Sequence, residues 1–467
     1  MQKKIIVSIL LLAGVLVISG CGCKQPNPKQ YTLNLEMWGL FDDQDAFNTI
    51  IENYKKLNPN IGTITYKKMS PDTYRKDLLE ALASGKGPDI FLMQNHWLPS
   101  FGNKLVPAPA AIINEQQYRN IFVDVAAQDF IAQGAIYAAP LAIDSLALYY
   151  NKDLFNAAGI TSPPRDWNEF VTDSRKLTRI DANGQIIYSG AAMGRPANAQ
   201  EGAINRATDI VNLLMLQAKT DMIDLTSGRA IFDQMIAGGS TPGQDALNFY
   251  TQFSDRSSSL YSWNSRMHNS IDAFSEGNVG MMFNYSWQMA TIASKAPKLN
   301  FGVAPVPQFS GNPPVNYPNY WAFAVSKNKT PDTAGMDPAI AASTVTSDIR
   351  VGEAWKFLTY LTVKSDPALI IAAGNGKVDP NFDPAVDYLT KTGKPSARRD
   401  LIEQQKTDPK MGVFAQGNLI AKDWLQVDPD STENIFNSMI DQVNRGQSSV
   451  QEALKSAAVN VSRLAAQ

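Results

Sequence analysis

The sequence predicts an α/β fold with two lobes, and two observations support that prediction. Residues 31–93 alternate strand-like and helix-like segments, a pattern typical of a parallel sheet covered by helices. A second set of such segments begins near Asp144. The chain has 467 residues, of which 44% are hydrophobic, so it can bury a sizeable core. We therefore expect two interleaved lobes rather than three independent domains.

The first set contains three strands and two helices. Alternating apolar and polar residues predict a strand over 31–39, and an amphipathic helix with acidic residues at its start follows over 42–57. A second strand is expected over 63–69, and a second helix over 70–85 is closed by glycines. The strand over 88–93 is largely apolar, as expected in the middle of a parallel sheet.

The second set starts with a strand that runs into Asn151, followed by a helix with Asp166 as its expected cap. An Asn-Gly pair within 181–186 predicts a hairpin turn. Residues 328–350 are rich in Thr, Ala and Asp and are expected to form a surface insertion. The remaining expected elements are helices at 205–222, 241–254, 270–276, 353–362 and 430–464, and strands at 279–284, 299–307 and 320–326.

The composition favours a binding protein over an enzyme. With two Cys and two His, the chain has no basis for a disulfide framework, a thiolate metal cluster or a multi-histidine metal site. The formal net charge of −2 argues against nucleic-acid binding. We therefore expect no catalytic residues, no metal and no cofactor. Eight Trp and sixteen Tyr supply the amphipathic aromatic rings typical of binding surfaces.

The N-terminus has the pattern of an export signal. Two lysines precede an apolar run over 5–19, which is shorter than the roughly 20 residues that span a bilayer. The run ends in Ile-Ser-Gly-Cys, which resembles the bacterial lipobox, whose Cys is lipidated. Residues 1–20 are therefore expected to be a lipoprotein signal peptide, and 21–30 the lipidated Cys21 and a tether. The body would then lie outside the cytoplasm, anchored to the cell membrane by lipid.

Five segments carry a family resemblance, in one order along the chain. They are ALASGKGPDIFLM (81–93), a stretch from an apolar strand through YNKDLF to an Asp-Trp helix start (135–170), AFSEGNVGMMFNYSWQM (273–289), PKLNFGVAPVPQFSG (297–311) and a closing helix (444–464). Together they resemble the bacterial extracellular solute-binding proteins of ABC importers, of the type that binds maltose and other sugars.

That resemblance implies a type II-like periplasmic-binding-protein fold, in which hinge strands join two α/β lobes around a ligand cleft. Lobe 1 would hold 31–143 plus 303–326, and lobe 2 would hold 146–300 plus 350–467. The protein would act as a monomer, capture a small solute, expected to be a sugar, and deliver it to the permease subunits of the importer. It would change no bond in that solute.

Three candidate ligand-binding residues follow predicted strands of the first lobe. Trp38 ends the strand over 31–39, while Gln94 and His96 follow the strand over 88–93. In open α/β sheets the carboxyl ends of the strands face the ligand crevice, and sugars are bound by aromatic rings and polar groups. Packing in the core is the alternative for Trp38. Met93 stands where a Trp occurs in maltose binders, which argues against maltose itself as the ligand.

The resemblance supplies the other candidates for the ligand site. Asp144 lies where the family's hinge segment has a carboxylate that reaches the ligand, with a structural salt bridge as the alternative. Trp287 matches a Trp that stacks on the ligand. Tyr320 and Trp321 begin a strand that crosses between the lobes, and one of them is expected to face the cleft. Trp263 lies in a loop that could reach the ligand.

The sequence also leaves functions other than sugar capture open. The same fold could bind a peptide, a polyol or a polyamine, or it could serve as an adhesion lipoprotein. A secreted lipoprotein hydrolase is the rival from the enzyme class. Asp42 and Asp43 could imitate the carboxylate pair of a glycosidase, but they lie at a helix start, where acidic residues are common. The sequence contains no G-x-S-x-G elbow of a serine hydrolase.

Overall fold

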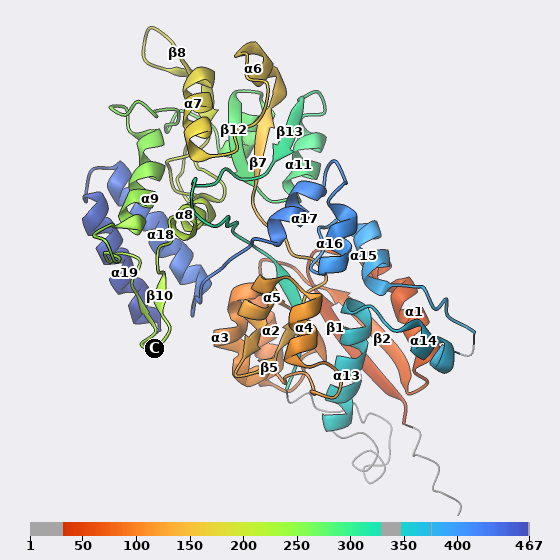
Figure 1. Ribbon diagram of the computed structural model, residues 1–467. Helices are drawn as coiled ribbons and strands as arrows, with labels where there is room; N and C mark the ends of the chain where they lie inside the picture. The colour runs from red at the N-terminus through yellow and green to blue at the C-terminus, as the bar shows by residue number, and fades with distance from the viewer. Residues whose placement is uncertain (1–30, 328–346, 375, 466–467) are drawn as a thin grey trace, which may run out of the picture.

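The computed structural model describes residues 31–327, 347–374 and 376–465, which form two lobes, each built on a five-stranded sheet (Figure 1). The first sheet has the strand order β2-β1-β3-β14-β6. Strand β1 pairs in parallel with β2 and β3, and β14 is antiparallel to both β3 and β6. The strands are β1 (Leu33–Gly39), β2 (Ile61–Lys68), β3 (Ile90–Gln94), β6 (Ala138–Ala139) and β14 (Trp321–Val325).

Helices cover the first sheet because their apolar faces are buried against it. Helix α1 buries Ile50, Ile51 and Tyr54 on one side, which is the amphipathic face that the sequence predicts. The helices of this lobe are α1 (Asn48–Leu57), α2 (Tyr74–Ala83), α3 (Leu98–Phe101), α4 (Glu115–Ile121), α5 (Asp124–Phe130), α13 (Ser347–Thr362), α14 (Pro367–Gly374), α15 (Pro384–Thr392) and α16 (Arg399–Gln405). Two short strands, β4 (Ile131–Ala132) and β5 (Ala135–Ile136), form a hairpin beside them.

The second sheet has the strand order β13-β7-β12-β9-β8. Strand β7 is antiparallel to both of its neighbours, and β12 is parallel to β9. The predicted hairpin at 181–186 is present, because β8 pairs antiparallel with β9 and Gly184 adopts a φ of +75° in the turn. The strands are β7 (Ala147–Asn151), β8 (Arg179–Ile180), β9 (Ile186–Ala191), β12 (Val279–Asn284) and β13 (Phe301–Ala304).

Helices of the second lobe surround this sheet. Asp166 caps α7 as predicted, since its side chain accepts the backbone N–H groups of Asn168 and Glu169. The elements are α6 (Lys152–Ala157), α7 (Trp167–Leu177), α8 (Ala207–Gln217), α9 (Pro242–Thr251), α10 (Ser270–Ser275), α11 (Gln288–Lys295), α17 (Gly412–Asn418), α18 (Pro429–Asn444) and α19 (Val450–Leu464), with a small ribbon of β10 (Ile223–Asp224) and β11 (Arg229–Ala230).

The chain crosses between the two lobes three times. The first segment of the chain that belongs to the first core ends at Ile143, and the second core begins at Leu146, so one crossing lies between these residues. A second crossing lies between Tyr317, which belongs to the second core, and Tyr320, which belongs to the first. The third lies within 402–424, where residues of both cores alternate: Phe414 and Trp424 belong to the second core, and Ala415 and Ala421 to the first. Each lobe is therefore assembled from segments that are far apart in the sequence.

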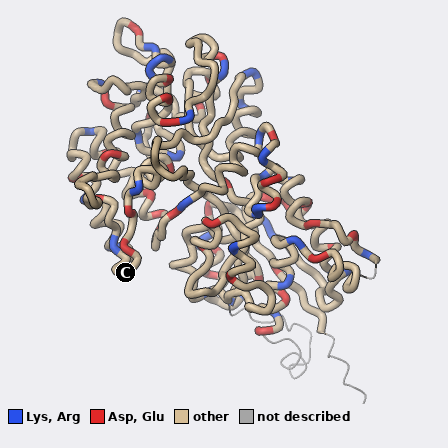
Figure 2. The backbone as a smooth tube through the Cα atoms, in the orientation of Figure 1, with Lys and Arg blue, Asp and Glu red and all other residues tan. Residues whose placement is uncertain are grey.

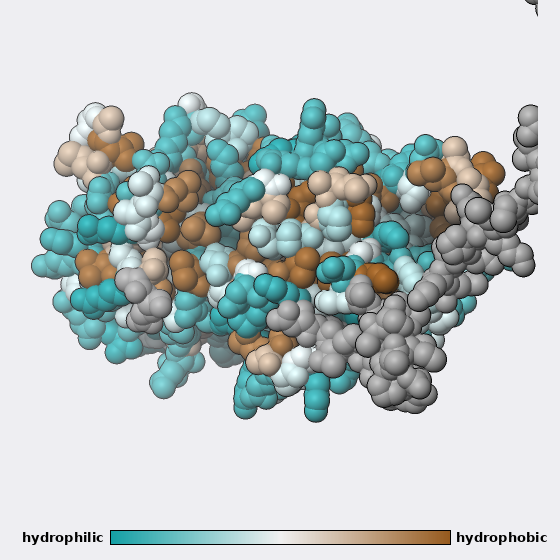
Figure 3. Space-filling model, turned by 90° about the horizontal axis from the view of Figure 1, so that it is seen from below, coloured by the Kyte–Doolittle hydropathy of each residue, from teal (hydrophilic) through white to brown (hydrophobic). Residues whose placement is uncertain are grey.

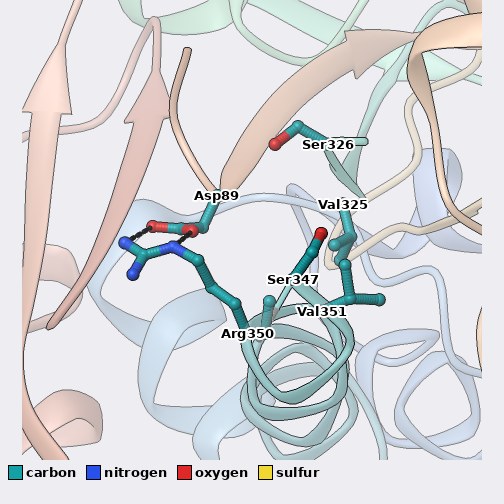
Figure 4. A pocket seen from close by; sticks show the side chains of 7 residues that line it. Asp89, Val325, Ser326, Ser347, Arg350 and Val351 are labelled. Atoms are coloured by element: carbon teal, nitrogen blue, oxygen red, sulfur yellow. Dashed lines mark hydrogen bonds and ion pairs between the residues drawn. The ribbon is translucent and has the colours of Figure 1, made fainter. Parts of the chain in front are cut away.

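Helices α13 to α16 pack on the first core, whereas the expected boundaries put 350–467 wholly in lobe 2. Trp355, Phe357 and Leu358 of α13 are buried in that core. Arg350 at the start of α13 also forms a buried pair with Asp89, just before β3 (Figure 4). We therefore reassign 347–402 to lobe 1. The placement of β13 also differs from the expected boundaries. Residues 303–306, which were expected in lobe 1, belong to the second sheet and core.

The expected signal peptide (1–20), the tether (21–30) and residues 328–346 of the expected insertion lie outside the described residues. Across 31–327, 347–374 and 376–465, none of the helices has both the length and the apolar character needed to cross a membrane. Lys and Arg positions are interspersed with Asp and Glu positions along the backbone of both lobes (Figure 2).

Candidate functional site

A cleft of about 1230 Å³ lies between the two lobes and is lined by residues of both. Its first wall comes from the ends of β3 and β14, the residues after β1, and the segment from Tyr388 to Pro395. Its second wall comes from the N-terminal ends of α8 and α11 and from β13. The crossing at 141–144 forms part of its floor. This volume exceeds that of a typical pocket for a small ligand and suits an extended one.

Trp321 and Phe41 supply aromatic surface on the first wall. Trp321 is the first residue of β14 and pairs with Gln94 at the end of β3, so both predicted residues line the cleft. The ring of Phe41 meets Trp321 edge to face, with centroids 5.7 Å apart, and Phe41 is half-exposed. Behind Trp321 lies the buried ring of Trp97, 5.1 Å away, which fixes the indole in place.

Trp287 supplies an aromatic surface on the second wall. It follows β12 and precedes α11, and its side chain is 43% exposed, although most large apolar side chains of this lobe are buried. Its ring stacks on the buried Tyr285, with centroids 4.7 Å apart and planes 19° apart. The hydroxyl of Tyr285 donates to Asp209, so the supporting ring is itself held. This is the arrangement of a rigid platform that faces the cleft.

Asp144 occupies the crossing between the lobes and also lines the cleft. Its carboxylate accepts the backbone N–H and the hydroxyl of Ser286 and the backbone N–H of Ser145. No ion pair involves Asp144 among the described residues, so the alternative of a structural salt bridge is replaced by these hydrogen bonds. Burial raises the pKa of Asp144 to about 7, although the hydrogen bonds from Ser286 and Ser145 act to lower it.

Tyr320 lines the cleft only in part, because its hydroxyl points away from it. The hydroxyl donates to Asp129, and the side chain is buried. Of the two residues at the start of β14, Trp321 is therefore the one that offers its ring to a ligand.

His96 belongs to a buried polar cluster that joins the lobes. Its Nε2 lies 2.5 Å from Oδ2 of Asp423, which also accepts from the side-chain amide of Asn95. Burial lowers the pKa of His96, but the carboxylate of Asp423 outweighs this and the pKa is raised. Burial and the charge of Asp423 raise the pKa of Asp129 well above its usual range. His96 does not line the cleft, and its contacts indicate a structural role.

Trp38 and Trp263 are buried in the cores, so the expectation that they bind the ligand is wrong. The Nε1 of Trp38 donates to Glu36, and its side chain is buried. Trp263 has no exposed surface, and its Nε1 donates to the carbonyl of Gly202 at 2.8 Å. Neither lines the cleft. A buried indole with its N–H satisfied has no group left for a ligand.

Phe41, Arg206 and Lys394 line the cleft and were not among the predicted residues. Phe41 lies two residues beyond β1, on the same side of the lobe where Trp38 was expected. Lys394 forms an ion pair with Asp42, which is so distant in the sequence that no local pattern could have predicted the contact. Arg206 caps α8 with a left-handed φ of +67°, and a loop before a predicted helix is the only signal that could have found it.

The described residues contain no group of three or more His, Cys, Asp or Glu side chains placed to hold a metal ion. The chemistry of the cleft is thus that of rings, amides, carboxylates and cations. Such groups bind and orient a ligand with apolar faces and polar edges.

The sequence matches a known family and several curated proteins. The family described as bacterial extracellular solute-binding protein matches residues 38–365. A Brucella abortus protein described only as a binding protein is 26% identical over 263 residues, which are 56% of this chain and 59% of that protein. A maltotriose-binding protein of Pyrococcus abyssi is 23% identical over 271 residues, 57% of this chain and 51% of that protein. The chain therefore spans about half to three fifths of these curated relatives.

Solved structures match over nearly the whole chain. The cyclic alpha-maltosyl-1,6-maltose binding protein from Arthrobacter globiformis has a TM-score of 0.70 at 19% identity, covering 93% of this chain and 99% of that one. The sugar-binding protein MalE from Xanthomonas citri has a TM-score of 0.69 at 16% identity, covering 93% and 98%. These matches confirm the predicted two-lobed α/β fold.

Proposed function

The chain belongs to the family of bacterial extracellular solute-binding proteins, and on that premise we propose that it is the ligand-capturing component of an ABC importer. We propose further that its ligand is an oligosaccharide or a related sugar, bound in the cleft between the lobes. The protein delivers this ligand to a membrane permease and changes no bond in it.

The observation that carries the proposal is the pair of indoles on opposite walls of one cleft. Trp321 belongs to the first lobe and Trp287 to the second, and both line the cleft. A pyranose ring has an apolar C–H face that stacks on an indole and a rim of hydroxyls that need hydrogen bonds. Gln94 and Asn319 line the same cleft and supply amide groups for that rim.

Capture is proposed to work by closure of the lobes. The three crossings are the places where a small change of backbone angle rotates one lobe against the other. Closure buries the ligand between the two indoles, and the closed surface is what the permease recognises. Micromolar affinity, which corresponds to about −8 kcal/mol, is the magnitude expected for such a site. The sugar ligands named for the structural neighbours support the same ligand class.

The anchor and the assembly state are part of the proposal. We propose that Cys21 is lipidated after removal of 1–20 and holds the body at the outer face of the cell membrane. A chain with Cys21→Ala should then carry no lipid, which mass spectrometry of the purified protein would show. The protein is proposed to act as a monomer, and the face in Figure 3 supports this because its hydrophobic residues occur in separate places among hydrophilic ones.

A thermal-shift screen tests the proposed function. The mature protein is melted with neutral and acidic oligosaccharides, polyols, tripeptides and polyamines, each at millimolar concentration. At 100 times its Kd, a ligand that binds only the folded state adds about 2.7 kcal/mol of stability and raises the Tm by several degrees. A response to a sugar supports the proposal. A response only to peptides or polyamines contradicts it, and turnover of any compound would favour an enzyme.

A further inference from the structure

The cleft has an excess of positive charge that the rest of the chain does not share. Its lining includes the four cations Lys152, Arg206, Lys394 and Lys410, but only two carboxylates, Asp42 and Asp144. The whole chain carries a formal net charge of −2. The local surplus is therefore a property of the cleft and not a consequence of overall composition.

The two carboxylates in the cleft are already occupied by protein groups. Asp42 accepts two hydrogen bonds from Lys394, at 2.6 and 2.8 Å, and one from the hydroxyl of Tyr388. Asp144 accepts three hydrogen bonds from Ser286 and Ser145 and is buried. Lys394 is thus neutralised by Asp42, while neither carboxylate is available to the other three cations.

Arg206, Lys152 and Lys410 form no side-chain ion pair with any residue that the structure describes. The Nε of Arg206 is buried without a hydrogen-bond partner in those residues. Asp209 and Glu433 both lie within electrostatic range of Arg206, but neither lines the cleft, and the carboxylate of Asp209 accepts the hydroxyl of Tyr285. Asp408 lies near Lys410 and instead accepts the backbone N–H groups of Lys410 and Met411.

Arg206 is placed beside the proposed stacking platform. Its Cζ lies 5.5 Å from the ring centroid of Tyr285 and 5.4 Å from that of Trp287, while the two centroids are 4.7 Å apart. The guanidinium therefore makes cation–π contacts with both rings, while Trp287 keeps 43% of its surface exposed for a ligand. A pyranose stacked on Trp287 carries its exocyclic carbon at the ring edge. If that carbon belongs to a carboxylate, the carboxylate lies at the edge of the sugar ring, where the guanidinium of Arg206 can form a charge-assisted pair with it.

We propose that the ligand of this cleft is an acidic oligosaccharide whose sugars carry carboxylates, that is, a uronate-containing glycan. The inference rests on the proposed function and narrows its ligand class. Arg206 binds the carboxylate of the sugar on Trp287. Lys152 and Lys410, which are exposed at the mouth of the cleft, attract the charges of neighbouring sugars. Arg206 lines the cleft without a side-chain ion-pair partner among the described residues, so its guanidinium can form a charge-assisted pair with a bound carboxylate.

The experiment is a set of calorimetric titrations of the mature protein with tetramers of α-1,4-galacturonate, β-1,4-mannuronate and β-1,4-glucuronate. Each acidic tetramer is compared with its own methyl ester, which keeps the shape and removes the charge. Maltotetraose, cellotetraose and mannotetraose are the neutral series. We expect one acidic tetramer to bind at least tenfold more tightly than its ester, with an affinity that falls as the salt concentration rises.

Variants locate the effect in the cleft. Arg206→Gln and Lys410→Gln should each lower the affinity for the acidic tetramer, Arg206→Gln by at least tenfold. Lys455→Gln, which removes one exposed cation from α19 away from the cleft, should leave the affinity unchanged. Lys410 is exposed, so its substitution keeps the test valid if Arg206→Gln fails to fold.

The two possible failures are distinguishable. Binding of a neutral tetramer, or equal binding of an acidic tetramer and its ester, would overturn the acidic-ligand inference and leave the proposed sugar capture intact. Binding of none of the sugars would contradict the proposed function, and the inference with it.

Discussion

The indole of Trp287 stacks on the phenol of Tyr285 at a centroid distance of 4.7 Å, and Trp287 is the partner that remains exposed to the cleft. Tyr285 is fully buried and hydrogen-bonded through its hydroxyl to Asp209. One ring is therefore anchored in the core and holds the other at the surface. This relationship explains why an exposed indole is rigid enough to serve as a binding platform.

Replacing Trp287 by alanine should remove that platform. We expect the sugar identified by the screen to bind at least tenfold more weakly to Trp287→Ala, a loss of about 1.4 kcal/mol or more. Trp287→Phe keeps an aromatic face and should lose less. Both can be measured by titration calorimetry. An unchanged affinity of Trp287→Ala would remove this residue from the site.

Trp263 should behave in the opposite way, because it fills the core of the second lobe. Trp263→Phe leaves a cavity and deprives the carbonyl of Gly202 of its donor. We expect the free energy of unfolding to fall by about 1–3 kcal/mol. Urea denaturation measures this, with Trp287→Phe as the control that should change stability by about 0.5 kcal/mol or less. Equal effects of the two substitutions would argue against our placement of Trp263.

Asp144 should make the stability of the protein depend on pH. Its pKa is about 7 in the folded state, against an ordinary value of 3.8, so the folded protein holds this proton more tightly than the unfolded chain. The free energy of unfolding therefore falls as pH rises from about 4, and the loss is complete somewhat above pH 7.

Asp144→Asn cannot ionise and should lack that loss. From pH 5 to pH 8, the free energy of unfolding of the wild type should fall by about 2–3 kcal/mol more than that of Asp144→Asn. Other buried groups with shifted pKa values, such as His96 and Asp129, are present in both proteins, so their contributions cancel in the comparison. Denaturant titrations at the two pH values supply the numbers. Parallel pH profiles would show that Asp144 is already ionised in the folded state at pH 5.

Arg350 should be essential for attaching α13 to the first lobe. Its guanidinium contacts Asp89 through two nitrogens, and both side chains are buried. Arg350→Met leaves a buried carboxylate without this partner and should cost about 3–5 kcal/mol of stability. Lys356→Met, on the same helix, breaks an ion pair whose lysine is 55% exposed and should cost about 1 kcal/mol or less. Similar costs for the two variants would contradict the reassignment of α13.

Local patterns of the sequence predicted the elements and the fold class well. The alternation over 31–39 corresponds to β1, the polar cap at Asp166 starts α7, and the Asn-Gly turn joins β8 to β9. These features depend on neighbours in the sequence, so the residues themselves carry the information. The two-lobed fold was also predicted, through the order of five segments, and the structural matches confirm it.

Local sequence patterns could not predict which segments belong to each lobe or which residues line the cleft. The apolar face of α13 shows that the helix is buried, but not against which core. Trp263 and Trp287 both lie between regular elements, and only packing determines that the first is enclosed and the second exposed. Arg206 reaches the cleft because the N-terminus of α8 is directed there, which is a tertiary property.

A crystal structure of the protein with the sugar that gives the largest thermal shift tests the central claim most directly. The account predicts one pyranose ring stacked on the outer face of Trp287, within the cleft and in contact with residues of both lobes. A ligand bound outside this cleft, or inside it with no ring on Trp287, would contradict the account.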